Sequence, residues 1–251
     1  MSELVRVDVS DHVMVISMQR EAKRNAINRE LADGIDAALN QLEDSPDLWV
    51  GILTGTPTVF SAGTDFSAGA DNRTERGGEY GIIRRRRRKP LIAAVEGYAL
   101  GGGFEIVLAC DLVVAANDVT FGLPEVARGV IPTSGGLFRA PRALPIHVAK
   151  EMMLTGERIS AVRAERLGVV NLLTGPGVAV TEARSLAERM VRNSPLSMQA
   201  CVAAVEELFR ADDDRGWAAT DAALSSLTDT ADIQEGVQAF LEKRQPVWTG
   251  R

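Results

Sequence analysis

The chain has 251 residues, of which 45% are hydrophobic, and a formal net charge of −6. This length and apolar content suffice for a substantial core, which excludes the disordered class of proteins. The negative charge disfavours nucleic acid or an anionic membrane as the main partner. Residues 1–6 lack the apolar core of a signal peptide and no run approaches the length of a membrane span, so we expect a soluble, cytoplasmic protein.

Apolar segments of five or six residues alternate with segments whose apolar residues recur at helical spacing. The predicted strands are nearly continuous in apolar residues, as is typical of strands covered on both faces. They are 13–18, 49–54, 91–95, 112–116 and 169–173, with a second, shorter set at 59–61, 98–100 and 119–121. The predicted helices are 29–43, 104–109, 146–155 and 161–167. These patterns alone predict an α/β fold.

From about Thr181 the sequence predicts helices only. Ser194 and Pro195 have the arrangement of an N-cap and a first helical residue. These late helices are amphipathic and have no strands to cover, so we expect them to pack on another surface. We therefore predict a core over 1–190 and a helical region over 191–251. The alternative is that the helices form a cap on their own subunit.

The cysteines and histidines are too few for a metal or disulfide framework. Cys110 and Cys201 both lie in apolar helical patterns, which predicts small buried side chains in a reducing compartment. His12 and His147 share no motif with them. A zinc site is therefore not expected.

The segment 92–105 carries the clearest functional signal. An apolar strand ends at three glycines, Gly101 to Gly103, that open a helix with Glu105 in its first turn. Glycines let backbone N–H groups approach a ligand closely at the positive end of a helix dipole. This arrangement is typical of an oxyanion hole beside an acid or base group. A glycine run alone is also compatible with a plain strand-to-helix turn.

Four further motifs favour the functional interpretation, at 23–28, 59–66, 120–125 and 129–136. Together with the glycine run, and in this order, they resemble the enoyl-CoA hydratase/isomerase (crotonase) superfamily over nearly the whole chain. Segments 131–136, 142–145 and 246–248 most resemble carnitinyl-CoA dehydratase and its bacterial relatives. The resemblance implies a crotonase-type spiral of strand-strand-helix units. It also implies that the C-terminal helical region forms a trimer interface and helps to cover the acyl-CoA site.

Four residues at the reaction centre acquire roles from this resemblance. Adding water across a double bond conjugated to a thioester builds charge on the thioester oxygen, so two preorganised donors aimed at it matter most. By resemblance these are the backbone N–H groups of Thr64 and Gly102. Glu105 and Glu125 match the two carboxylates that activate water and deliver the proton, and one of them must hold a proton near neutral pH. Either glutamate taken alone would be compatible with a helix-terminus or solvated charge.

Further matches concern substrate binding. By resemblance, the coenzyme A channel is lined by Arg24, Ala26, Ala62, Asp65 and Phe66, with the adenine between the two loops that carry them. Phe240 and Lys243 match residues that reach a ligand from the last helix, in this subunit or a neighbouring one. The alternative is that Lys243 only makes a favourable charge interaction with the dipole at the end of the last helix. Relatives usually have a proline where this chain has Glu21, which alters loop rigidity without removing a contact group.

Six consecutive cations, Arg84–Arg88 and Lys89, form the strongest local charge feature. Such a run could bind phosphate or RNA. A helix would spread the six around its circumference, so we expect solvated charge near the nucleotide end of coenzyme A. The preceding segment 71–80 is polar and contains glycine, so we expect a mobile loop over the site.

The sequence therefore predicts a hydro-lyase that adds water to trans-2-enoyl-CoA thioesters. We expect no metal or redox cofactor, and coenzyme A is part of the substrate. We also expect the chain to assemble with itself as a homotrimer or hexamer. Carnitinyl-CoA dehydratase and enoyl-CoA isomerase activities, which use the same carboxylates, stay open. An alternative of another class is a catalytically weak acyl-CoA or RNA-binding protein. The sequence leaves the acyl chain length, head group and pathway open.

Overall fold

The computed structural model describes residues 3–69 and 71–251. Two residues of the N-terminal segment 1–6, and Ala70, lie outside this range. The described strands are β1 (Val5–Ser10), β2 (Val13–Met18), β3 (Val50–Thr54), β4 (Arg73–Thr74), β5 (Gly78–Glu79), β6 (Leu91–Val95), β7 (Tyr98–Leu100), β8 (Leu112–Ala116), β9 (Thr120–Gly122), β10 (Arg158–Ser160) and β11 (Leu172–Thr174). The described helices are α1 (Arg29–Asp44), α2 (Gly102–Leu108), α3 (Gly136–Ala143), α4 (Ile146–Thr155), α5 (Ala161–Arg166), α6 (Ala179–Val191), α7 (Pro195–Ser225) and α8 (Ala231–Glu242). Short 3-10 helices are η1 (Glu21–Lys23), η2 (Phe66–Ala68) and η3 (Glu125–Arg128).

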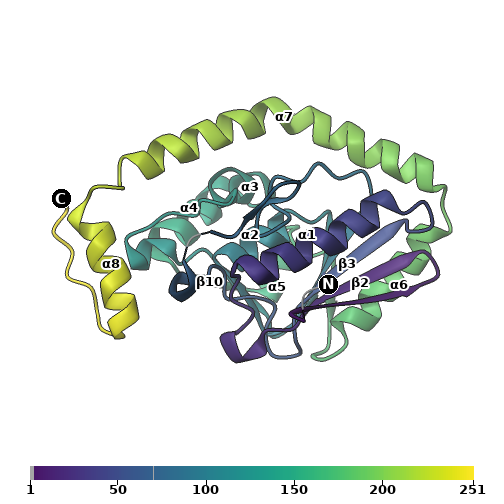
Figure 1. Ribbon diagram of the computed structural model, residues 1–251, viewed down its shortest axis with the longest axis horizontal. Coiled ribbons are helices and arrows are strands. Elements are labelled where there is room, and N and C mark those ends of the chain that lie inside the picture. The colour runs from purple at the N-terminus through teal and green to yellow at the C-terminus, as the bar shows by residue number, and fades with distance from the viewer. Residues whose placement is uncertain (1–2, 70) are drawn as a thin grey trace.

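A six-stranded sheet in the order β1-β2-β3-β6-β8-β11 forms the centre of the molecule (Figure 1). Its strands are parallel except for the antiparallel β1–β2 pair. Successive side chains of a strand point to opposite faces. In β2, Met14 and Ile16 therefore join the core cluster that includes α1, while Val13 and Val15 join the cluster that includes α6. Both faces being covered explains why these strands are apolar throughout.

A smaller, three-stranded sheet has the order β10-β9-β7. The chain enters it directly from β6 of the large sheet. β7 follows β6 after a two-residue turn at Glu96 and Gly97, and it pairs in parallel with β9. Glu96 is buried, and its carboxylate accepts hydrogen bonds from the N–H groups of Gly177 (3.0 Å) and Ala179 (2.9 Å) at the start of α6. This bond pair ties the turn between the two sheets to α6.

Most predicted elements are confirmed. The strands 13–18, 91–95, 98–100 and 112–116 and the helix 146–155 have the predicted bounds, and Ser194 caps α7 as expected. The strand predicted at 169–173 begins later, at Leu172, because Val169 and Val170 are buried in a turn that bonds back to α5. The segment 59–61 forms isolated bridges and no strand. β1, β10 and α3 were not predicted.

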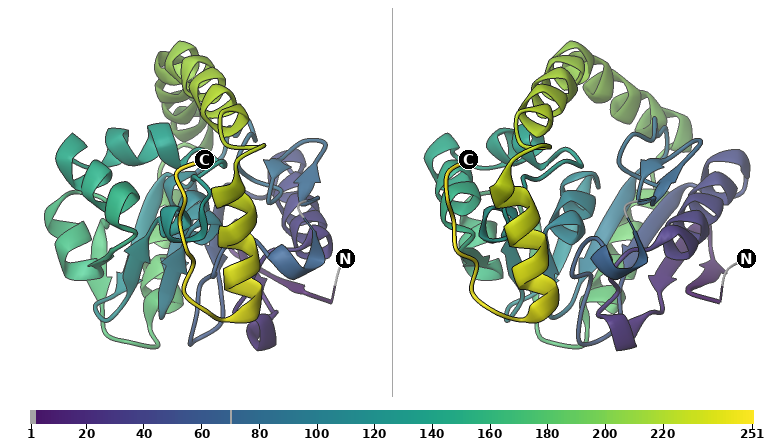
Figure 2. Two further views of the ribbon diagram at one scale, coloured as in Figure 1. Left: turned by 90° about the vertical axis from the view of Figure 1, so that its left-hand side faces the viewer. Right: turned by 60° about the vertical axis from the view of Figure 1, so that its left-hand side comes forward.

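The C-terminal helices differ in how much of their own chain they contact. α6 packs on the large sheet, whereas the 31-residue α7 spans about 46 Å and arches over the core (Figures 1 and 2). Thr220 is the buried residue of α7. Cys201 lies exposed on this helix, so the expectation that it is buried is wrong, while Cys110 is half-buried. The division into 1–190 and 191–251 stays a prediction. Among the described residues, no helix is both long and apolar enough to cross a bilayer.

The expectation of solvated charge is wrong for half of the cationic run. Arg85, Arg87 and Lys89 are each less than 10% exposed. Arg85 pairs with Asp36 of α1, and Arg87 makes two bonds to the carboxylate of Asp111. Lys89 donates to the carbonyl of the α1 C-terminus. Carboxylates distant in the sequence therefore neutralise Arg85 and Arg87, backbone carbonyls bind Lys89, and the run is no continuous basic surface.

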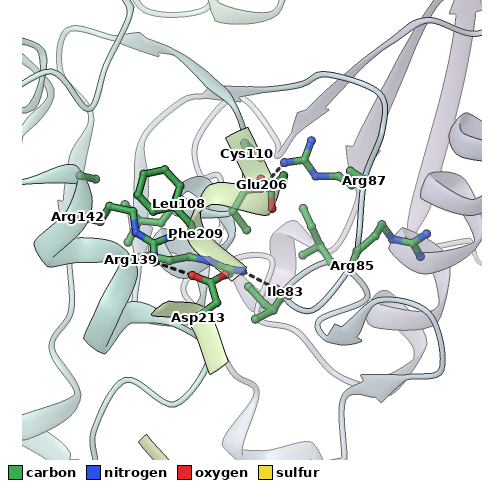
Figure 3. Close-up of a pocket in the computed structure, with 13 residues that line it drawn as sticks. Ile83, Arg85, Arg87, Leu108, Cys110, Arg139, Arg142, Glu206, Phe209 and Asp213 are labelled. Atoms are coloured by element: carbon green, nitrogen blue, oxygen red, sulfur yellow. Dashed lines mark hydrogen bonds and ion pairs between the residues drawn. The ribbon is translucent and has the colours of Figure 1, made fainter. Parts of the chain in front are cut away.

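A cavity of 160 Å³ lies between this run, α3 and α7 (Figure 3). Its lining residues are Ile82, Ile83, Arg85, Arg87, Leu108, Ala109, Cys110, Arg139, Arg142, Ala143, Glu206, Phe209 and Asp213. Neither Glu105 nor Glu125 lines it. The inward side of the run thus faces α7 and not the predicted reaction centre.

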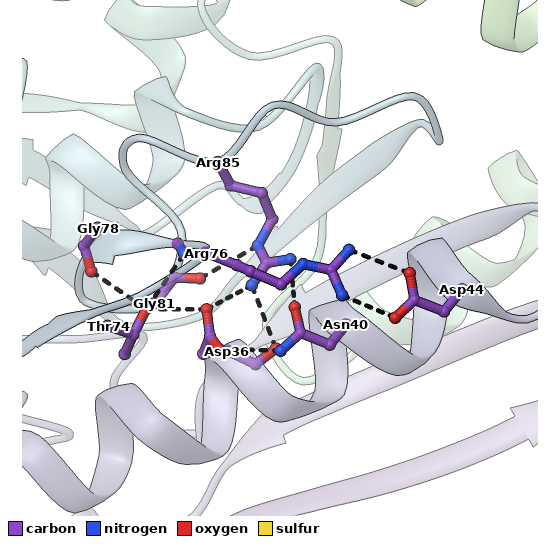
Figure 4. A network of polar contacts seen from close by, with 9 residues as sticks. Asp36, Asn40, Asp44, Thr74, Arg76, Gly78, Gly81 and Arg85 are labelled. Atoms are coloured by element: carbon purple, nitrogen blue, oxygen red, sulfur yellow. Dashed lines mark hydrogen bonds and ion pairs between the residues drawn. The ribbon is translucent and has the colours of Figure 1, made fainter.

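Polar contacts with α1 hold the segment 71–89 in place (Figure 4). The carboxylate of Asp36 accepts bonds from the Thr74 hydroxyl (2.8 Å) and the Arg85 guanidinium (2.5 Å). Asn40, one turn along α1, donates to Asp36 (2.9 Å) and accepts from Arg85 (2.7 Å). The segment expected to be a mobile loop therefore contains a short hairpin, β4–β5, and the bonds of Thr74 and Arg85 to Asp36 on either side of Tyr80 oppose that mobility.

We predict that Asp36→Ala lowers the free energy of unfolding by about 3 kcal/mol, because it leaves the buried Arg85 guanidinium without its counter-ion. Urea denaturation measures the change. Asp33→Ala is the matched control on the same helix, since Asp33 pairs with Arg29 at the surface. An exposed pair contributes about 1 kcal/mol or less. Equal losses of unfolding free energy in the two variants would contradict a buried ion pair between Asp36 and Arg85 that holds the segment.

Candidate active site

Two neighbouring parallel strands bring the two predicted glutamates together. Leu100 at the end of β7 is in register with Gly122 at the end of β9, and the Gly101 N–H donates to the Gly122 carbonyl (2.9 Å). α2 follows β7 and carries Glu105 in its first turn, and η3 follows β9 and begins with Glu125. Because parallel strands end at the same edge of a sheet, both carboxylates meet there.

The turn between β7 and α2 depends on glycine in two ways. Gly101 has φ +54° and ψ −127°, a backbone conformation that other residues rarely adopt. Gly102 has no positive φ, but a Cβ at this position would lie 2.5 Å from the hydroxyl of Tyr80. The space beside Gly102 is therefore bordered by an aromatic side chain.

The segment with Thr64 lies directly against this turn. Ser61 bridges to Ala99 of β7, and a Cβ on Gly63 would lie 2.9 Å from the Gly102 nitrogen. Within residues 3–69 and 71–251, the backbone N–H groups of Thr64 and Gly102 donate no hydrogen bond. Two N–H groups that lie at adjacent segments and have no acceptor are available to donate to a ligand, as the predicted oxyanion hole requires.

Glu105 is 2% exposed and firmly held. Its Oε1 atom accepts hydrogen bonds from the N–H groups of Ser134 (2.7 Å) and Gly136 (2.8 Å), the second at the start of α3. Burial raises the pKa of this carboxyl above its usual range, and the two hydrogen bonds act against that rise because they favour the ionised form.

Glu125 is 8% exposed, and its Oε2 atom is buried without a hydrogen-bond partner in the described chain. Burial, and then the negative charge of Glu105, raise the pKa of its carboxyl. A Cβ on Gly101 would lie 3.0 Å from Glu125 Oε1, which places this carboxylate at the same turn as the free N–H groups. A carboxyl whose pKa is raised by burial and by a neighbouring carboxylate retains a proton near neutral pH.

Tyr80 is a site residue that sequence reasoning missed. It is 3% exposed, and its hydroxyl lies 2.7 Å from the Thr64 hydroxyl. Burial, with the charge of Glu105, raises the pKa of the phenol well above its usual range, so it is neutral. The available signal was modest: Tyr80 is the single aromatic residue of segment 67–90.

The two loops predicted to line the coenzyme A channel are adjacent. The N–H of Ala62 donates to the Arg24 carbonyl (3.0 Å). Ala26, in the same loop as Arg24, is half-buried. Asp65 is buried, and its carboxylate accepts from the Arg20 guanidinium at 2.7 Å. The Asp65 side chain thus holds the loop, while Arg24 is exposed beside it.

The terminal helix reaches the same loops within one chain. The Phe66 and Phe240 rings meet edge to face with centroids 5.8 Å apart, and the Arg128 guanidinium lies 4.5 Å from the Phe240 ring. Lys243 is exposed at the end of α8. The structure therefore brings Phe240 to the two loops, while the contacts of these residues and of Lys243 with a ligand stay a prediction. In the described part of the chain, no cluster of three or more His, Cys, Asp and Glu side chains could hold a metal.

Comparison with known proteins matches this arrangement to one family. The family model for enoyl-CoA hydratase/isomerase matches residues 8–251. Carnitinyl-CoA dehydratase of Salmonella enteritidis is 38% identical over the full length of both chains. The crystal structure of carnitinyl-CoA hydratase from Mycobacterium avium has a TM-score of 0.92 at 38% identity over both full chains. An enoyl-CoA hydratase structure from Mycobacterium tuberculosis has a TM-score of 0.80 at 41% identity over 99% of each chain.

The fold is thus the crotonase fold, with α/β core and C-terminal helices. The chain belongs to the enoyl-CoA hydratase/isomerase family, within the crotonase superfamily.

We predict that Glu125→Gln stabilises the protein increasingly as pH rises. A carboxyl whose pKa is raised on folding binds its proton more tightly in the native state, so stability is highest below the unfolded-state pKa and falls as pH rises through the native one. Glutamine removes this loss. Urea midpoints at about pH 5 and pH 9 should diverge between variant and wild type.

The exposed Glu157 supplies the control, because Glu157→Gln should give the same difference from wild type at both pH values. A stability difference for Glu125→Gln that does not grow with pH would contradict a buried, proton-holding carboxyl.

Proposed function

We propose that this protein is a hydro-lyase that adds water reversibly across the double bond of trans-2-enoyl-CoA thioesters. One observation carries the proposal: two buried glutamates with raised pKa values lie at the Gly102 turn, beside Thr64, and the N–H groups of Thr64 and Gly102 have no acceptor among the described residues. A thioester oxygen at these two donors would place the conjugated carbons between the carboxylates.

The surroundings of the two glutamates assign them different roles. Two backbone N–H groups bind Glu105 and favour its ionised form. Glu125 has an unpartnered buried oxygen and faces the charge of Glu105, which favours its protonated form. Glu105 is therefore the general base and Glu125 the general acid for hydration.

The hydration step follows from these roles. Glu105 takes a proton from water as the water oxygen bonds to C3, and the electron pair of the double bond moves toward the thioester oxygen. The N–H groups of Thr64 and Gly102 stabilise the negative charge that builds on that oxygen. Glu125 then gives its proton to C2. Dehydration runs through the same steps with the two roles exchanged.

Carnitinyl-CoA dehydratase activity is a second candidate, supported by the names of similar proteins. It uses the same elimination of water with a different acyl group, and it is distinguished by a panel of CoA thioesters monitored through the enoyl chromophore. The pairing of Arg85, Arg87 and Lys89 inside the fold removes the main support for an RNA-binding role.

We predict that Glu105→Gln and Glu125→Gln each lower the hydration rate by about 100-fold or more, the usual contribution of a general acid or base. Affinity for coenzyme A should stay nearly unchanged. The double variant should lose less than the product of the two, because the pair acts as a unit. Steady-state kinetics with crotonyl-CoA measures each loss.

Glu96→Gln is the matched control, because Glu96 is also a buried glutamate that accepts two backbone hydrogen bonds. Its carboxylate binds the start of α6, so kcat should be nearly unaffected while stability falls. Near wild-type hydration by either Glu105→Gln or Glu125→Gln would exclude the proposed role of that residue.

We further propose that the subunits form trimers or pairs of trimers. The 31-residue helix α7 carries apolar side chains along its length, and three of them are more than half exposed: Leu196, Val205 and Leu208. A long helix with an uncovered apolar surface is typical of an interface. Sedimentation at micromolar concentration should show trimer or hexamer, and a monomer would contradict this proposal.

A further inference from the structure

We propose that the Tyr80 side chain is the wall that closes the acyl end of the site and restricts the enzyme to short acyl groups. This inference rests on the proposed function, because it takes the N–H groups of Thr64 and Gly102 as the donors that hold the thioester oxygen. It assigns a specificity-determining role to a residue that the chemistry itself does not use.

The position of the phenol follows from two contacts. Its hydroxyl is 2.7 Å from the Thr64 hydroxyl, and a Cβ built on Gly102 would lie 2.5 Å from Oη, 2.6 Å from Cζ and 2.8 Å from Cε2. The end of the ring thus packs on both residues that carry the free N–H groups. A thioester oxygen bound to these donors lies about 3 Å from each nitrogen. Tyr80 is therefore within contact distance of the first few acyl carbons.

The electrostatic surroundings place the hydroxyl on the side of the reacting carbons. Among the charges that act on the phenol, Glu105 contributes most and Glu125 less. The acyl group must accordingly fit between the two glutamates and the phenol.

The wall cannot move aside easily. Tyr80 has φ +57°, a conformation that a bulky residue holds only when its surroundings enforce it. Its N–H donates to the Asn72 carbonyl (2.9 Å), and the hairpin before it is tied to Asp36 through Thr74. Arg85, five residues later, is bound to the same carboxylate. Both flanks of Tyr80 are therefore fixed to α1 (Figure 4).

A rigid wall at this distance sets a length limit. Extending an acyl chain beyond it requires the chain to displace the ring from a closely packed position, and added methylenes in a filled pocket are rejected rather than accommodated. Crotonyl-CoA, with one carbon beyond the double bond, avoids the ring. Trans-2-decenoyl-CoA does not.

The test compares hydration of crotonyl-CoA and trans-2-decenoyl-CoA by wild type, Tyr80→Phe and Tyr80→Ala. We expect wild type to prefer the short substrate by about 100-fold in kcat/KM, given how strongly several methylenes are discriminated. Tyr80→Phe keeps the ring and should keep the preference. Tyr80→Ala should reduce the preference at least tenfold by raising kcat/KM on the long substrate. Thermal unfolding checks that each variant is folded, and Tyr80→Leu replaces Tyr80→Ala if that variant is not.

A binding measurement separates this inference from the hydratase proposal. Calorimetry with saturated butyryl-CoA and decanoyl-CoA needs no turnover. If wild type hydrates neither enoyl-CoA but binds butyryl-CoA more tightly, and Tyr80→Ala removes that difference, the wall stands and the proposed reaction fails. Equal kcat/KM of wild type on both substrates, or a preference unchanged in Tyr80→Ala, would overturn the wall.

Discussion

The parallel pairing of β7 with β9 is the constraint on which the site depends. A single ladder sets Leu100 opposite Gly122 and lets Gly101 donate to the Gly122 carbonyl at 2.9 Å. Each strand is three residues long, so each leaves the sheet at once and begins a helical turn. The glutamates at the two exits are twenty residues apart in the chain, yet they meet because the strands end together. A slip of one residue in this register would turn the side chains of one strand to the other face.

The burial of both carboxyls has a cost that the surrounding structure offsets unequally. Glu105 receives two backbone N–H groups, whereas Glu125 keeps an oxygen without a partner. A buried polar atom without a hydrogen bond destabilises a fold and persists where function requires it. The same inequality separates the protonation states of two chemically identical side chains, so the backbone around 134–136 determines which glutamate carries the charge.

The sequence predicted most strands of the large sheet and proposed two glutamates as catalytic residues, for identifiable reasons, and the roles of the glutamates stay a prediction. Strands covered on both faces are apolar throughout, and Glu105 and Glu125 stand at recognisable positions in motifs. It did not predict β10 or the failure of 59–61 to form a strand, because three-residue elements are decided by tertiary pairing. Arg85 and Arg87 were misjudged since their partners, on α1 and after α2, are distant in sequence. Tyr80 escaped notice because its position is set by the fold of a polar segment.

The glutamates and Tyr80 are supported by separate parts of the molecule. The carboxylates depend on the backbone between 101 and 136, while the segment with Tyr80 is anchored to α1 through Asp36. Tyr80 itself also packs on Gly102 and couples to that turn, whereas substitutions at its anchor on α1 are more nearly additive with those at the glutamates. In the function proposed for this protein, changes at the α1 anchor of the 71–89 segment would alter which acyl groups enter without removing the acid or the base. An enzyme built in this way can acquire new substrates by variation in one clamped hairpin while its chemistry is inherited unchanged.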